Sequence, residues 1–296
     1  MSKVRLVRRF LPGRHRRRRT LPLPSRTVAP GRSPTPLPGT TMPGTAAPST
    51  GVSSEPQTRS FETSCWVCGH TGTFERGAKR VLGGFVCPNC RAILRYQGQA
   101  RALVRCYSRD GARSLAELVE EPAFRALRIY EPGDKGVLQR FLRTVPVHVR
   151  TSYVPDVEPG AHVNGVRCED LMALTFPAGE FDLVITHDVM EHVRRPRAAF
   201  AEIHRVLRPG GRHVFTIPVR HPMRPKTITR VDVSGDEDVF LAKPAYHDEH
   251  LVYNDFGADL LELLDDIGFD TEVVRFESPD EEASTQLTFC SRRRDH

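Results

Sequence analysis

Polar side chains that can exchange protons follow directly after an apolar run in the middle of the chain. In FDLVITHDVMEH, residues 181–192, the run LVI is followed by His187 and Asp188, and then by Glu191 and His192. Imidazole titrates near neutral pH and a carboxylate can accept a proton, so these residue types suit acid–base chemistry. The alternative is that Glu191 and His192 only form local hydrogen bonds at the start of a helix.

Four cysteines form two C-x2-C pairs ahead of this segment, and eighteen residues separate the pairs. They are Cys65, Cys68, Cys87 and Cys90. Each spacer lets two thiolates face one point, so the two turns together can surround one ion with sulfur. We predict a zinc-ribbon module with a structural zinc ion, because four thiolates leave no coordination position open. An iron site of rubredoxin type is the alternative.

The other three cysteines, Cys106, Cys168 and Cys290, are scattered. The N-terminal segment lacks the apolar stretch of a secretory signal, so we expect a reducing, cytoplasmic location without disulfides. No stretch approaches the roughly 18 apolar residues that a membrane span needs.

Segments with strand-like and helix-like patterns alternate after residue 114, where Ser114 and Glu117 fit a capping box that opens a helix to about residue 121. Strands are predicted at 127–130, 145–154 and 181–188, after the break at 209–211, and near 271–276 and 284–291. Residues 166–176 are predicted to begin as a strand and to turn into a loop at Glu169 and Asp170. Further helices are predicted over 137–142 and 197–207 and between a cap at Asn254 or Asp255 and a stop at Gly268.

This alternation predicts an α/β fold with a doubly wound, mostly parallel sheet. Ligands of such sheets bind at the carboxyl ends of the strands, where the topology switches. The polar residues that end strand 181–188 are therefore expected to face a ligand. The turn EPGDKG, residues 131–136, follows another strand and precedes a helix, an arrangement typical of nucleoside or phosphate binding.

Residues 131–219 resemble the class I S-adenosylmethionine-dependent methyltransferases, and in particular the type 11-like group. The elements F-D-L-V, E-H-V and R-V-L-R-P-G-G follow one another in CEDLMALTFPAGEFDLVITHDVMEHVRRPRAAFAEIHRVLRPGG in the order and at the distances of that family. The resemblance implies a Rossmann-like methyltransferase fold and S-adenosyl-L-methionine as the cofactor.

The resemblance also implies which residues bind the cofactor: Glu131, Gly133, Gly136, Ser152, Glu169, Asp170, Leu171 and His187. Glu131 and Gly133 match the loop that touches the methionine part, and residues 169–171 match the segment beside the adenine. The chain departs from the pattern at Lys135, where a second glycine is usual, so that Gly136 falls one place late. It also departs at the end of the second strand, where Ser152 and Tyr153 stand in place of a ribose-binding acid.

His192 and Asp188 are the candidate catalytic residues, and His187 is a further candidate base. Methyl transfer depends on alignment of the nucleophile with the methyl carbon at about 3–3.5 Å, and a base helps where the acceptor is a hydroxyl or a protonated amine. Residues 220–253 form an insert expected over the active site or, alternatively, a surface loop. Its candidate acceptor contacts are His221, His247, His250 and Tyr253. The spacing of these histidines fits no metal-ligand template.

Three parts are predicted along the chain: a disordered, basic, Pro-rich tail over 1–60, the zinc-ribbon module over 61–98, and the methyltransferase domain over 99–296. The tail holds twelve Lys/Arg and one acid, which gives +11 against +7 for the whole chain, so the remainder carries −4. Such a basic segment can bind nucleic acid or an anionic membrane, or it can be a solvated extension.

The favoured function is O- or N-methylation of a small-molecule or sugar-type acceptor. One alternative is an RNA methyltransferase of the ribosomal type, in which the zinc ribbon and the basic arm hold phosphate. Arg91, Arg95, Arg101 and Arg105 could contribute to such binding or could lie in water. The acidic folded part and the lack of an aromatic–basic platform disfavour nucleic acid. The other alternative is a non-catalytic interaction protein with a degenerate cofactor pocket.

Overall fold

The computed structural model describes residues 59–76, 84–133, 136–235, 237–247, 249–281 and 283–295. These residues belong to one compact unit, Ser54–His296. The predicted tail lies outside the described residues up to residue 58, as does Lys135 of the glycine turn.

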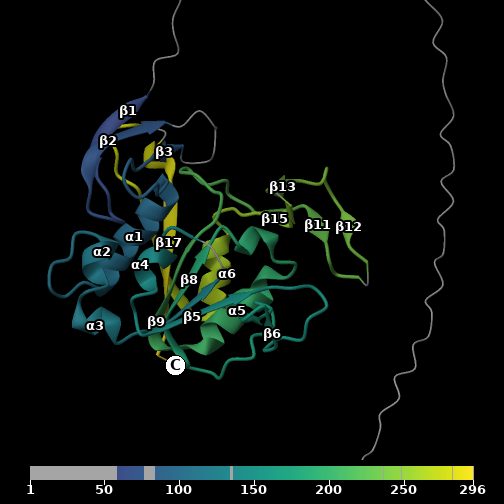
Figure 1. Ribbon diagram of the computed structural model, residues 1–296. Coiled ribbons are helices and arrows are strands. Elements are labelled where there is room, and N and C mark those ends of the chain that lie inside the picture. Colours follow the sequence, from purple (N-terminus) through teal and green to yellow (C-terminus); the bar gives the residue numbers. More distant parts are fainter. Residues whose placement is uncertain are drawn as a thin grey trace, which may run out of the picture. The chain divides into compact units, whose positions relative to one another are not determined.

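An eight-stranded sheet forms the centre of the fold, and its parallel part confirms the predicted doubly wound architecture (Figure 1). The strand order is β16-β17-β9-β8-β4-β5-β7-β6. The parallel strands are β4 (Arg128–Pro132), β5 (Val147–Ser152), β7 (Val166–Cys168), β8 (Phe181–His187) and β9 (Leu207–Thr216). The antiparallel edges are β6 (His162–Val163) on one side and β17 (Leu287–Arg293) with β16 (Phe269–Arg275) on the other.

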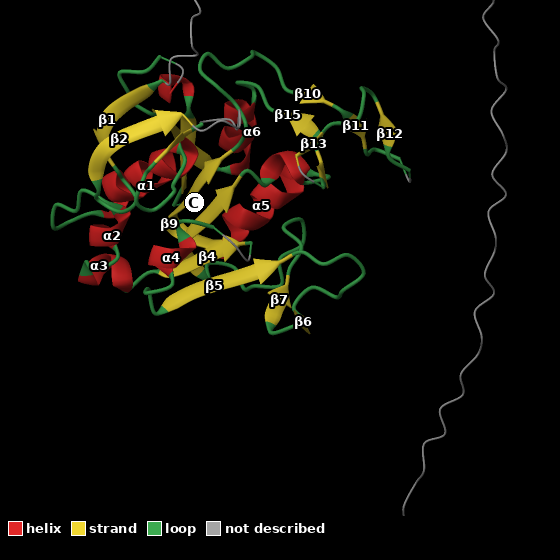
Figure 2. Ribbon diagram, turned by 45° about the horizontal axis from the view of Figure 1, so that its top comes forward, coloured by secondary structure: helices red, strands yellow, loops and turns green. Residues whose placement is uncertain are grey.

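Alternate residues of the central strands pack into two different hydrophobic clusters, as a side-chain period of two requires. Leu183, Ile185 and Val214 face the first cluster, while Val184 and Phe215 face the second. The first cluster is covered by α1 (Leu94–Tyr107), α2 (Leu115–Leu118), α3 (Pro122–Arg125) and α4 (Gln139–Leu142). The second is covered by α5 (Pro196–Val206) and α6 (Leu260–Ile267), on the opposite side of the sheet (Figure 2).

Local signals fix most helix ends. Ser114 caps α2 by accepting a hydrogen bond from the Glu117 backbone N–H at 3.2 Å, as predicted, although α2 already ends at Leu118. Gly268 ends α6 in the left-handed conformation, with φ 112°. The predicted cap at Asn254 or Asp255 is wrong, because these residues form β15 (Asn254–Asp255) and Asp259 precedes α6.

The sequence Pro209-Gly210-Gly211 does not precede the fifth strand, as predicted, but lies inside β9. The partner of Phe181 on β9 is Leu207 and the partner of Leu183 is Arg212, so β9 takes up the extra residues as a register shift. A Cβ at Gly211 would lie 2.9 Å from the Arg208 carbonyl oxygen, which explains why this irregularity requires glycine.

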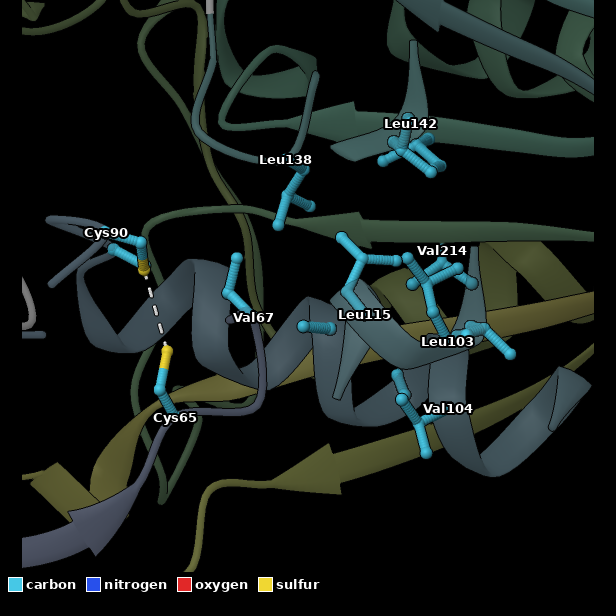
Figure 3. Packing of buried hydrophobic residues seen from close by; sticks show 14 of the residues in the cluster. Cys65, Val67, Cys90, Leu103, Val104, Leu115, Leu138, Leu142 and Val214 are labelled. Atoms are coloured by element: carbon cyan, nitrogen blue, oxygen red, sulfur yellow. Dashed lines mark hydrogen bonds between the residues drawn. The ribbon is translucent and has the colours of Figure 1, made fainter. Parts of the chain in front are cut away.

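The four-cysteine segment forms a small antiparallel sheet from β1 (Ser60–Ser64), β2 (Thr71–Arg76) and β3 (Phe85–Val86). Its buried side chains belong to the same hydrophobic cluster as Leu103 and Leu115 of helices α1 and α2 (Figure 3). Two backbone hydrogen bonds join the segment to α2, at 2.7 Å from Leu115 N–H to Trp66 and at 3.0 Å from Ala116 N–H to Val67. Helix α1 runs across the predicted domain boundary at residues 98 and 99, and that boundary stays a prediction.

The insert over residues 220–253 is built from short antiparallel pairs rather than from helices. They are β10 (Ile228–Thr229) with β15, β11 (Val231–Asp232) with β12 (Val239–Phe240), and β13 (Tyr246–His247) with β14 (His250–Leu251). None of the helices in the described part of the chain combines the length and the apolar character that a membrane crossing requires.

Candidate active site and four-cysteine cluster

The carboxyl end of β8 places two predicted site residues, His187 and Asp188, beside helix α1. Asp188 has a left-handed backbone conformation with φ 49°, which turns the chain sharply after the strand. Its Oδ2 forms an ion pair with the Arg95 guanidinium, while its buried Oδ1 has no hydrogen-bond partner among the described residues. Arg95 is itself 9% exposed, so it neither lies in water nor is available to grip RNA.

His187 is held as a neutral imidazole in one tautomer. Its ring stacks on Tyr96 at 3.9 Å between centroids, and its Nδ1 lies 2.7 Å from Gln99 Oε1. The Gln99 amide nitrogen donates to the Thr186 carbonyl at 2.9 Å, so Oε1 accepts and the proton of His187 sits on Nδ1. Burial lowers the pKa of His187 to about 4. At neutral pH its Nε2 therefore carries a lone pair.

A second histidine, His213 on β9, is buried beside this strand end. Its Nε2 lies 2.9 Å from Thr186 Oγ1, and burial lowers the pKa of His213 from 6.5 to about 3. The unfolded chain binds a proton at this histidine more readily than the folded chain does. The contribution of the neutral histidine to folding stability is therefore complete above pH 6.5 and is lost as the pH falls toward 3.

We expect His213→Gln to make the stability less dependent on pH. In the parent protein, protonation of this histidine on unfolding should lower the free energy of unfolding by about 2 kcal/mol as the pH falls from about 7 to about 5. Glutamine can keep the bond to Thr186 without titrating. Urea unfolding at several pH values measures the difference, and His162→Gln on exposed strand β6 should retain the parental slope. Equal slopes for all three proteins would contradict this assignment.

His192 lies at the end of the 3-10 turn Met190–His192 and is fixed by the insert. Its Nδ1 lies 2.8 Å from the Leu251 carbonyl oxygen, which can only accept, so Nδ1 carries a proton. The Tyr253 backbone N–H donates to the Glu191 carbonyl at 2.8 Å. These two contacts place residues of the insert directly against the predicted catalytic histidine and leave its Nε2 free to act as a base or a ligand.

The glycine turn after β4 leaves room for a ligand. Gly133 has φ 115°, and no atom lies within 4 Å of the position that a Cβ would occupy. Its backbone is fixed by hydrogen bonds to the Thr151 carbonyl at 2.7 Å and from the Gln139 amide at 3.1 Å. Glu131 is buried, and one of its oxygens lies 2.9 Å from His148 Nε2. Gly136, the next described residue, lies close to the side chains of Gln139 and Glu131.

A cavity of about 210 Å³ brings residues of the predicted cofactor and catalytic sets together. It is lined by Tyr153, Asp170, Leu171, Met172, His192, Val193, Arg194 and Tyr253. The predicted adenine-flanking residues and the candidate base thus share one wall. An adenosyl group fits this chemistry, because Tyr153, Leu171 and Met172 supply apolar surface while Asp170 supplies an acceptor.

The remaining predicted cofactor residues do not line this cavity. Glu169 is buried, and its carboxylate accepts hydrogen bonds from Arg167 at 2.7 Å and from the Thr175 backbone N–H at 2.9 Å. Ser152 ends β5, where its carbonyl accepts from the Glu169 N–H at 3.2 Å. Both residues therefore shape the strand ends beside Asp170.

Sequence reasoning missed the contribution of helix α1 to the site. Arg95, Tyr96 and Gln99 contact Asp188 and His187, which follow them by roughly ninety positions. The only local signal was the presence of polar residues on the face of an otherwise apolar helix, and that pattern is also typical of solvent exposure.

The four cysteines lie close enough to bind one ion, because their sulfur atoms are all within 4.8 Å of one another. The Sγ atoms of Cys65 and Cys90 are 3.6 Å apart (Figure 3). Those of Cys68 and Cys87 are 3.8 Å apart. A tetrahedral ion with sulfur ligands at about 2.3 Å requires edges of about 3.8 Å. The geometry therefore fits the predicted ligand set.

Polar groups around the cluster favour a thiolate at Cys65, whereas the hydrogen bond with Cys65 and burial raise the pKa of Cys90. The Gln97 amide nitrogen lies 3.1 Å from Cys65 Sγ, and the Asn89 amide nitrogen lies 3.4 Å from Cys68 Sγ. The hydrogen bond with Cys90 lowers the pKa of Cys65 to about 5, and the Cys68 and Gln97 N–H groups act in the same direction. Donors of this kind orient and stabilise metal-bound sulfur.

Comparisons with known proteins identify the class. Residues 138–215 match the model of a family described as a methyltransferase domain. Together with the sheet described above, this match shows that the chain carries a class I S-adenosylmethionine-dependent methyltransferase domain of the type that the sequence predicted.

Solved structures with similar chains include S-adenosylmethionine-dependent methyltransferases from two organisms. The protein from Mesorhizobium loti has a TM-score of 0.42 and 21% identity, over 66% of this chain and 98% of its own. The protein from Methanosarcina mazei has a TM-score of 0.34 and 15% identity, over 57% of this chain and 93% of its own. No curated protein matches the chain.

Proposed function

We propose that this methyltransferase acts on a hydroxyl or amine of a small-molecule or sugar-type acceptor. The observation that carries the proposal is the cavity shared by Asp170, Leu171 and His192. S-adenosylmethionine supplies a methyl group on a sulfonium centre, and the adenine-flanking pair and the candidate base face the same space. A cofactor and its acceptor need such a common chamber to reach in-line alignment.

The size and walls of the cavity favour a small acceptor. Its volume is about 210 Å³, which suits a small group, and Tyr253 of the insert forms one side. The Arg194 Nε donates to Asp238 at 2.7 Å, which ties the β11–β12 hairpin to the same wall. Arg101 and Arg105 of the basic stretch pair with Glu277 at 2.8 Å and Glu272 at 3.1 Å. These pairs reduce the positive charge that an RNA backbone would need.

Two groups can accept the proton that a hydroxyl or ammonium acceptor releases. The candidate groups are Nε2 of His192, whose Nδ1 is engaged by the Leu251 carbonyl, and Oδ1 of Asp188, which has no hydrogen-bond partner among the described residues. The insert also contacts His192, because the Leu251 carbonyl holds the imidazole in place. Positioning and desolvation are the main contributions expected of the protein, because the sulfonium is already a good leaving group.

We also propose that the four cysteines hold one structural zinc ion. All four coordination positions would be filled by sulfur, which excludes a direct role in methyl transfer. The ion would instead hold β1–β3 against helices α1 and α2, and α1 carries Arg95 and Gln99 to the active site. The metal would thus support the site at a distance.

Transfer of a labelled methyl group from S-adenosylmethionine to fractionated cell extract tests the proposed function. We expect label in the small-molecule or sugar fraction. His192→Asn should lower the rate by about a hundredfold, because Asn can still donate to Leu251 but has no equivalent of Nε2. His162→Asn should transfer at the parental rate. Label that enters only RNA or protein would overturn the proposed acceptor class.

A further inference from the structure

The carboxylate of Glu191 is buried without a hydrogen bond. The residue is 0% exposed, and neither Oε1 nor Oε2 has a hydrogen-bond partner among the described residues. A buried carboxylate without hydrogen bonds costs several kcal/mol unless a cation pairs with it. A cation at this position would remove that cost.

Two imidazoles face this carboxylate from different elements. The His192 Nε2 and the His247 Nδ1 each lie 3.5 Å from Glu191 Oε1. One ligand atom from each of the three residues lies within 4.8 Å of those of the others. The two rings are nearly perpendicular, at 88°, so their nitrogens approach the carboxylate from separate directions.

The tautomer of His192 is the one that a metal ligand requires. Its Nδ1 is engaged by the Leu251 carbonyl at 2.8 Å, so Nε2, which faces Glu191, is the ring nitrogen available to a metal ion. A hydrogen bond from the distal ring nitrogen to a carbonyl is the usual way in which proteins orient a metal-binding histidine. His250, whose ring centre lies 5.6 Å from that of His192, is close enough to join the set after a side-chain rotation.

The distances suit a tetrahedral or higher coordination shell. Nitrogen and oxygen ligands at about 2.0–2.1 Å from a divalent ion lie about 3.4 Å apart in a tetrahedron. The two edges to Glu191 are 3.5 Å. His247 lies on the half-exposed β13–β14 hairpin and can move by the few tenths of an ångström that closure of the third edge requires.

We propose that Glu191, His192 and His247 bind a divalent transition-metal ion with an open coordination position. Two imidazoles and one carboxylate select ions such as Zn²⁺, Co²⁺ or Mn²⁺ and leave positions for water or a ligand. The set differs from the four-cysteine cluster in ligand type and place, and the insert supplies one of its three members.

This site would determine the class of acceptor, an inference that rests on the proposed function. His192 also lines the cavity with Asp170 and Leu171, so an ion on its Nε2 would lie beside the methyl-transfer chamber. A divalent ion binds hydroxyl oxygen and makes it more acidic. The acceptor is therefore an oxygen compound, such as a diol or a hydroxyl beside a carbonyl, that binds the ion directly. His192 then acts as a ligand, and Asp188 remains the proton acceptor.

Cobalt binding to the full chain tests the site. After chelator treatment that leaves the cysteine-bound metal in place, we expect one equivalent of Co²⁺ to give a d–d absorption band without thiolate charge transfer. Glu191→Gln and His247→Gln should weaken this binding at least about a hundredfold. His162→Gln should bind like the parent protein. No added equivalent in the parent, or equal binding by the Glu191 and His247 variants, would overturn the proposal.

Thermal unfolding gives a second readout that does not depend on catalysis. Without added metal, Glu191→Gln should melt above the parent protein, because it removes a buried charge that receives no hydrogen bond among the described residues. Added Co²⁺ should raise the melting temperature of the parent only. A lower melting temperature for Glu191→Gln in chelator would show that His247 already neutralises the carboxylate, and would overturn the site.

Methyl transfer separates this inference from the proposed function. Loss of transfer in chelator and recovery with Co²⁺ would support the metal-bound acceptor. Full transfer in chelator would overturn the inference and leave the proposed function intact. Metal binding with no transfer to any small molecule would instead overturn the proposed function while the metal site stands.

Discussion

Cys65→Ser is expected to abolish binding of the proposed zinc ion and to lower the free energy of unfolding by at least about 3 kcal/mol. Cys65 is 1% exposed, and its cluster shares buried side chains with helices α1 and α2. Structural zinc contributes its binding energy directly to folding, and three sulfurs hold the ion far less tightly than four. For a domain of this size the melting temperature should fall by about 6–12 °C.

Metal analysis and thermal unfolding measure the two effects, and Cys168→Ser provides a matched control. Cys168 is equally buried, but its Sγ contacts the Val154 and Val157 carbonyls at 3.7 Å and lies outside the cluster. The control should therefore keep one zinc per chain. Full zinc content in Cys65→Ser would refute the ligand assignment, and iron in the purified parent would favour the rubredoxin-type alternative.

The sheet could be predicted from the sequence because its signals are local. The apolar run LVI, the capping residue Ser114 and the left-handed Gly268 each act within a few residues. The prediction failed where tertiary pairing overrides the local preference. Asn254 and Asp255 are good helix caps in isolation, but they pair with Thr229 and Ile228 and become strand β15.

Part of the site could also be predicted, because its signals are local in the sequence. A strand end places His187 and Asp188 at the carboxyl edge of the sheet, and the C-x2-C spacing brings the cysteines together. The approach of Gln99 to His187 could not be predicted, because the two residues are 88 positions apart and only the packing of α1 joins them. His247 reaches Glu191 only through the fold of the insert, so its spacing along the chain gave no ligand template.

Gly133→Arg is expected to abolish binding of S-adenosylmethionine, with an affinity loss of at least about a hundredfold, or about 3 kcal/mol. The turn after β4 has an open space at the Cβ position of Gly133, between the carboxyl ends of β4 and β5. A guanidinium side chain would fill this space, beside which we expect the methionine part of the cofactor to bind. Calorimetric titration with S-adenosylmethionine measures the loss.

A positive φ makes this substitution costly in itself, so the control must carry the same strain. Arginine at φ 115° costs about 1–2 kcal/mol of stability. Gly111 has φ 85° and equally open surroundings, but it lies in the loop between α1 and α2. Gly111→Arg should lose similar stability and bind the cofactor normally. Both variants should keep the proposed zinc ion, because neither glycine is adjacent in sequence to a cysteine of the four-cysteine cluster. If Gly133→Arg bound the cofactor as well as Gly111→Arg does, the pocket would have to lie elsewhere than at the β4 turn.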